Sequence, residues 1–234
     1  MSIANILTRL AEKITKVFNA GKDAEWNAFW DAYQSKGARG SYTWAFYGNG
    51  WNDTTFKPKY DIIFASGGNN NTQVFNSAQF TDFAGILERQ GVILDTSAYS
   101  GSNPVEWFYN CSRVTRVPTI DISNAPNGCG NLFSYCSKLH TVEKMILSEN
   151  GTTFTADTFY KCTALEEIRF EGKIASDITF GNCSSLSNDS IDSIINALSD
   201  TTTGMTCTIY LTDYFGNNWD ELVARKPNWR FAGA

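Results

Sequence analysis

Apolar positions recur along this chain in one repeated phrase: a phenylalanine, a cysteine three residues later, and a leucine or valine three residues after the cysteine. Four copies begin at residues 108, 133, 159 and 180, and intervals of 21 to 26 residues separate them. The repeated positions are Phe108, Cys111, Phe133, Cys136, Phe159, Cys162, Phe180 and Cys183. A period in this range is typical of leucine-rich solenoids, in which each coil buries its apolar face against its neighbours.

Short runs of alternating apolar residues follow three of the copies. They span residues 117–122, 142–147 and 168–170. Period-two alternation indicates a strand, and one strand in each coil would pair in parallel with the next. Pro118 has no N–H to donate, so we expect it at a strand start or at an unpaired position. Weaker copies around Phe46 and Phe75 raise the expected number of coils to about six, with the first two irregular.

Near the start of the chain the period changes to that of helices. Residues 3–18 carry apolar side chains at steps of mostly three and four, which predicts an amphipathic helix. Its stripe consists of Ile3, Ile6, Leu7, Leu10, Ile14 and Val17. Either the stripe packs on the protein's own body, or the helix is an assembly element that pairs with its copies or docks onto another protein. Residues 23–35 predict a second helix, whose aromatic stripe either caps the solenoid or forms a platform for sugars.

Further elements are predicted inside and after the repeats. A helix over residues 81–90 is expected to end at Gly91, and a strand over residues 92–94 follows it. Beyond the fourth copy, the pattern predicts a helix capped by Ser187 or Asn188. A strand, a short helix and a closing strand follow at residues 207–211, 219–225 and 229–231.

These elements together define the expected architecture. The sequence predicts an α/β protein, a leucine-rich-repeat solenoid with short parallel strands, N-terminal helices and a C-terminal helical cap. We expect two parts: residues 1–20 as the assembly or docking helix, and residues 21–234 as the repeat domain with its caps.

Composition narrows the classes of partner. The chain of 234 residues is 42% hydrophobic and has a formal net charge of −5, with no basic face for nucleic acid and no Lys/Arg run for anionic lipid. No stretch is long and apolar enough to predict a membrane span. The first ten residues are amphipathic and lack the apolar core of a signal peptide, so we expect synthesis and folding in a bacterial cytoplasm.

The cysteines and carboxylates do not form a catalytic or metal-binding pattern. Four of the six cysteines belong to the repeat, no C-x-x-C pair exists, and His140 is the single histidine. We therefore expect buried free thiols that act as small hydrophobic groups, although stacked coils would also tolerate disulfide geometry. The adjacent carboxylates at 166–167 and 220–221 diverge on a strand or helix, and no nucleophile motif lies near His140. The sequence thus predicts no catalytic residues, no cofactor and no metal.

The phrase and its strands resemble the BspA-like leucine-rich-repeat family over roughly residues 105–185. The wider layout is similar to leucine-rich-repeat proteins encoded in tail modules of phages and prophages of gut Firmicutes, through segments like those at 29–34, 56–62 and 190–198. BspA-like repeats usually occur in surface adhesins that carry secretion signals, and the expected lack of one here favours the phage resemblance.

That resemblance implies structure or binding and supplies no catalytic residues. It implies a phage tail or baseplate component located in the virion. The expected partners are its own copies or other tail proteins, with a host surface glycan or protein as a further partner. The alternative is a bacterial protein-interaction or adhesion module outside any virion.

Overall fold

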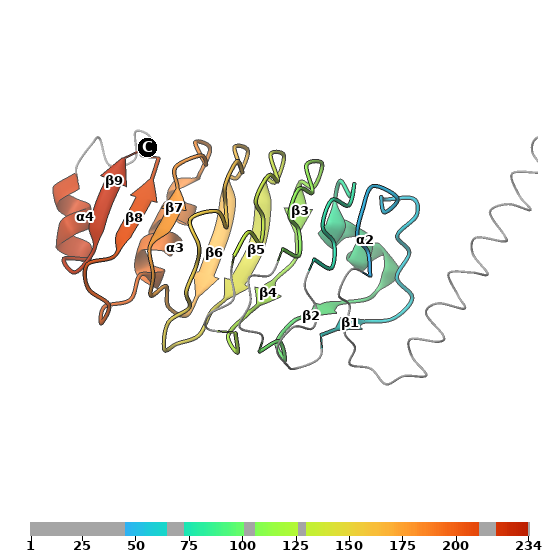
Figure 1. Ribbon diagram of the computed structural model, residues 1–234, viewed down its shortest axis with the longest axis horizontal. Helices are drawn as coiled ribbons and strands as arrows, with labels where there is room; N and C mark the ends of the chain where they lie inside the picture. The colour runs from blue at the N-terminus through green and yellow to red at the C-terminus, as the bar shows by residue number, and fades with distance from the viewer. Residues whose placement is uncertain (1–44, 65–72, 101–105, 126–129, 211–218, 234) are drawn as a thin grey trace, which may run out of the picture.

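The structure is a computed structural model that describes residues 45–64, 73–100, 106–125, 130–210 and 219–233. It is a mixed α/β fold in which short parallel strands form sheets and helices are few (Figure 1). Its elements are β1 (Ile62–Ile63), α2 (Phe83–Gln90), β2 (Leu94–Asp95), β3 (Arg116–Val117), β4 (Ile120–Asp121), β5 (Thr141–Ile146), β6 (Glu167–Glu171), β7 (Ile178–Phe180), α3 (Asn188–Ala197), β8 (Thr206–Ile209), α4 (Trp219–Arg225) and β9 (Arg230–Gly233).

The described strands form three parallel sheets. Strand β1 pairs with β2, strands β3, β4 and β6 all pair with β5, and β8 lies between β7 and β9. The strands follow one another along the long axis of the molecule in chain order, from β1 and β2 to β9, and α4 lies beyond β9 at that end (Figure 1). Strands β3 and β4 are two pieces of one run, and Pro118 lies in the unpaired gap between them as expected.

Consecutive phenylalanine turns are joined by the same hydrogen bonds. The backbone N–H of Phe75 donates to Trp107 O at 2.9 Å, and that of Phe108 donates to Leu132 O at 3.0 Å. The aromatic rings of successive turns stack, with centroids 4.7–5.8 Å apart from Phe46 through Phe180. The weak upstream copies at Phe46 and Phe75 therefore have the same neighbours as the four copies that contain cysteine.

Five of these six turns, all but the one at Phe180, place the second residue after the phenylalanine in the left-handed backbone region. The φ angles are +95° at Gly48, +61° at Ser77, +57° at Asn110, +65° at Tyr135 and +60° at Lys161. Glycine and asparagine adopt this region readily, whereas other L-residues lose about 1–2 kcal/mol there. The tyrosine and the lysine are thus unfavourable choices for the conformation that the turn imposes.

The cysteine of each copy satisfies a carbonyl of the preceding turn. The thiol of Cys111 donates to Phe75 O at 3.0 Å, that of Cys136 to Phe108 O at 2.9 Å and that of Cys162 to Phe133 O at 3.1 Å; for Cys183 the acceptor Phe159 O is 3.8 Å away. All four side chains are buried free thiols, which confirms the expectation from the sequence. Burial raises the pKa of each thiol, to about 12 at Cys183.

Helix α3 ends the β3–β5–β6 sheet at the outer edge of β6. Its residue Ser190 accepts the N–H of Ile168 at 2.9 Å and donates to Glu166 O at 2.8 Å, and Ser193 accepts the N–H of Phe170 at 2.8 Å. Serine hydroxyls therefore take the place of the backbone groups that a further strand would supply. The side chain of Ser187 accepts from Ser190 N, which makes it the N-cap and decides between the two residues expected from the sequence.

The strand expected at residues 92–94 is wrong for its first two residues. Gly91 caps α2 in the left-handed conformation, as expected, and the N–H of Val92 donates to Leu87 O, so both still belong to the helix end. Ile93 is 57% exposed, and strand β2 begins at Leu94.

Other boundaries differ by one or two residues, with β6, β8 and β9 each starting one residue from its expected position. The predicted helices over residues 3–18 and 23–35 lie outside the described residues.

Candidate functional site

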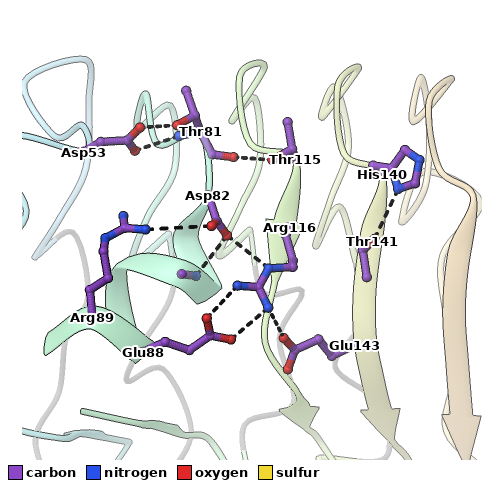
Figure 2. Close-up of polar contacts among 11 residues, drawn as sticks. Asp53, Thr81, Asp82, Glu88, Arg89, Thr115, Arg116, His140, Thr141 and Glu143 are labelled. Carbon is purple, nitrogen blue, oxygen red and sulfur yellow. Dashed lines mark hydrogen bonds and ion pairs between the residues drawn. The ribbon is translucent and has the colours of Figure 1, made fainter. Parts of the chain in front are cut away.

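A row of hydrogen-bonded carbonyls crosses the start of the β3–β5–β6 sheet and positions the side chains around it. Thr81 O accepts the N–H and the hydroxyl of Thr115, each at 2.7 Å. Thr115 O in turn accepts the N–H groups of His140 and Thr141, at 2.8 and 2.9 Å. In each copy, the residue that follows the leucine or valine therefore lies beside the residue at the same position of the next turn, as Thr115 does beside His140 (Figure 2).

Arg116 is the centre of the largest ion-pair cluster on this face. Its guanidinium contacts Asp82 at 3.1 Å, Glu88 at 2.8 Å and Glu143 at 2.9 Å (Figure 2). Asp82 is the N-cap of α2, Glu88 lies in the last turn of that helix, Arg116 begins β3 and Glu143 lies in β5. The cluster thus connects three elements that are far apart in the sequence.

The electrostatics of this cluster favour the charged forms of Glu88 and Arg116. The hydrogen bond from Arg116 lowers the pKa of Glu88. The reciprocal hydrogen bond from Glu88 raises the pKa of Arg116. An acid or base catalyst needs a pKa near the operating pH, whereas fixed charges suit the recognition of a complementary surface.

His140 lies between two polar partners on the same face. Its Nε2 is 2.6 Å from a carboxylate oxygen of Glu166, and its Nδ1 is 3.2 Å from the hydroxyl of Thr141. A hydroxyl, an imidazole and a carboxylate are the components of a nucleophilic triad, but such a triad also needs free N–H groups to stabilise an oxyanion. The N–H groups of His140, Thr141, Glu166 and Glu167 all donate to backbone carbonyls of adjacent turns. The contact between His140 and Glu166 joins the side chains of two adjacent turns.

The charged face continues into a groove of about 640 Å³ between the sheet and α3. Lys144, Arg169 and Lys173 line it together with the acidic residues Asp189 and Asp192 of α3. Within the described part of the chain Arg169 forms no ion pair, and its side chain is exposed. Glu149 and Glu171 also line the groove, so it has charges of both signs outside α3 and acidic residues on the helix.

The residues singled out from the sequence fall into two groups, one buried in the repeats and one outside the described residues. The phenylalanines and cysteines of the four copies form one buried column. The apolar stripe from Ile3 to Val17 lies outside the described residues.

Sequence reasoning missed the Arg116 cluster and the pair formed by His140 and Glu166. One signal for the pair was present, since both residues directly follow the leucine of their copy. Arg116 gave no such signal, because its partners on α2 and β5 are brought to it by the fold.

Comparisons with protein-family models, with curated proteins and with solved structures found no match to this chain. Over the described residues, no group of three or more histidine, cysteine, aspartate or glutamate side chains is arranged to hold a metal ion. In the same part of the chain, no helix has the length and apolar character needed to cross a bilayer.

Proposed function

We propose that this chain is a BspA-like leucine-rich-repeat solenoid that acts as a non-enzymatic structural component of a phage tail or baseplate. The single observation that carries the proposal is the repetition of one hydrogen-bond pattern over successive turns. Phe46, Phe75, Phe108 and Phe133 each donate from the backbone N–H to the residue before the next phenylalanine, at 2.9–3.0 Å. A stack in which each unit contacts its neighbours is the physical definition of a repeat protein.

Two further features favour a role within an assembly. The stacked aromatic column joins successive turns, and the ion pairs of Arg116 place charged side chains along one face. The resemblance of the layout to tail-module proteins supplies the context of the virion, and the stripe from Ile3 to Val17 supplies the expected contact with other copies or other tail proteins.

The proposal is tested by the mass of the intact chain in solution. A trimer or hexamer is expected, and deletion of residues 1–20 should leave a folded monomer with the same repeat domain. An intact chain that sediments as a monomer would refute self-association. If the deleted chain is less stable or aggregates, the stripe packs on the protein's own body.

The alternative, a bacterial adhesion or protein-interaction module, is favoured by the mixed-charge groove beside α3. The genes that flank the coding sequence separate the two functions, because tape-measure and tail genes are expected only for a virion component. Labelling of purified virions with an antibody against the chain would support the tail assignment, and labelling restricted to the cell surface would support the adhesion module.

A further inference from the structure

Arg169 is a groove-lining cation for which the described part of the chain supplies no ion pair. It directly follows Ile168 on β6, and Ile168 pairs with Val142 of β5. The residue after Val142 is Glu143, whose carboxylate already contacts Arg116 at 2.9 Å. The Arg169 side chain is exposed, so its guanidinium faces the groove without the acidic partner that Arg116 has.

Two acids of the groove are likewise held by other cations. Asp192 of α3 contacts Arg225 of α4 at 2.6 Å, and Glu171 at the end of β6 contacts Lys144 at 3.0 Å. These pairs neutralise part of the negative charge in the lining. The planar guanidinium of Arg169 therefore keeps its N–H groups for a ligand that enters the groove.

The groove also carries groups that can bond to hydroxyls. Glu149 and Asp189 line it, and within the described residues neither carboxylate forms an ion pair or a side-chain hydrogen bond. Ser193 accepts the N–H of Phe170 at 2.8 Å, which leaves the hydroxyl hydrogen of the serine to donate. A ligand thus meets a guanidinium, two carboxylates and a hydroxyl.

We propose that this groove binds an acidic sugar, a ligand with one carboxylate and several hydroxyls. The sugar carboxylate accepts two parallel N–H groups from Arg169, because the fork of a guanidinium matches the two oxygens of a carboxylate. The hydroxyls of the sugar donate to Glu149 and Asp189. The volume of about 640 Å³ lies within the range of about 300–1,000 Å³ that small-ligand pockets occupy.

The lining argues for an acidic sugar over an acidic peptide. Glu149 and Asp189 would repel the further carboxylates of an acidic peptide, whereas they accept hydrogen bonds from hydroxyls. Peptides and proteins are also anchored by apolar side chains that fill pockets. Among the residues that line the groove, only Phe170 and Ala197 have apolar side chains.

The inference rests on the host-contact part of the proposed function, which a tail component or an adhesion module could perform. It is tested on the purified intact chain. Failure to bind sugar would leave the virion assignment untouched, and absence from the virion would leave sugar binding untouched.

The test titrates the intact chain with 3′-sialyllactose, glucuronosyl-galactose and galacturonosyl-rhamnose, each of which carries a single carboxylate. Binding is measured by ligand-observed NMR. At least one of the three should bind, and its methyl ester, which lacks the negative charge, should bind at least tenfold more weakly. Hexaglutamate should not displace the sugar at an equal concentration.

Arg169→Gln should weaken binding of the sugar at least tenfold. Because Arg169 is exposed and unpaired among the described residues, this variant should unfold at the same urea concentration as the parent. The matched control is Arg113→Gln, which removes an exposed arginine of the turn before β3, outside the groove lining, and should leave binding unchanged.

Three results would overturn the proposal. The first is that none of the three sugars binds at millimolar concentration. The second is that the methyl ester binds as tightly as the acid, or that Arg169→Gln binds like the parent, because the guanidinium would then not hold the carboxylate. The third is displacement of the sugar by an equal concentration of hexaglutamate, which would assign the groove to acidic peptides.

Discussion

The thiol of Cys136 offers a test of why cysteine occupies the repeat position. It is fully buried and donates to Phe108 O at 2.9 Å. Cys136→Ala removes this hydrogen bond and one buried group the size of a methylene, which together stabilise the fold by about 2 kcal/mol. Cys136→Ser keeps a donor facing the same carbonyl, so the expected loss is about 1 kcal/mol, the remaining cost of burying a hydroxyl.

Cys183 supplies the matched control. Its thiol lies 3.8 Å from Phe159 O, too far for a strong bond, so serine should be no better than alanine there. The free energy of unfolding of all four variants would be measured by urea titration, with equal m-values as the check on two-state behaviour. If Cys136→Ser is less stable than Cys136→Ala, the thiol acts only as a small hydrophobic group and the hydrogen-bond argument is refuted.

Three other predictions concern the column, the sheet edge and the charged face. Phe133→Ala should lower the free energy of unfolding by about 3–5 kcal/mol in a urea titration, and unchanged stability would mean that the ring is not a core residue. Ser190→Ala should cost about 1–3 kcal/mol in the same assay, because the N–H of Ile168 loses its acceptor; amide exchange at Ile168 should then accelerate. Arg116→Met should destabilise the protein at pH 7, and the difference from the parent should shrink as the pH falls below 4.5, the ordinary pKa of Glu88. The lowered pKa of Glu88 stabilises the fold only while its carboxylate stays charged, so a difference that grows in acid would contradict this.

The sequence predicts the buried half of this molecule much better than its surface. Phenylalanine and cysteine recur at fixed spacing because every turn meets the same neighbours, so their burial follows from the period. The helix over 83–90 and its end at Gly91 also follow from local signals. Pro118 marks the break between β3 and β4 for the same reason, since a missing N–H is visible in the sequence.

The surface contacts depend on which side chains the turns bring together. Tyr135 follows its phenylalanine by two residues, whereas Tyr109 and Tyr160 follow theirs by one, so sequence spacing does not align the three rings. The fold brings the three rings together, with the backbone of Tyr135 in the left-handed region. Likewise, no local pattern indicates that Ser190 would act as the neighbour of a strand.

Because serine hydroxyls of α3 cover the edge of β6, the number of turns before β6 can change while the end of the sheet stays the same. The backbone N–H of Phe108 donates to Leu132 O, and that of Phe133 donates to Thr158 O in the same way. A duplicated turn placed between these two turns would therefore form the same hydrogen bonds on both sides. Each insertion would lengthen the body by one strand spacing, about 4.8 Å, and would leave the hydroxyls of α3 in contact with the same final strand. Gene duplication could therefore adjust the reach of this protein in discrete steps without exposing a new edge for aggregation.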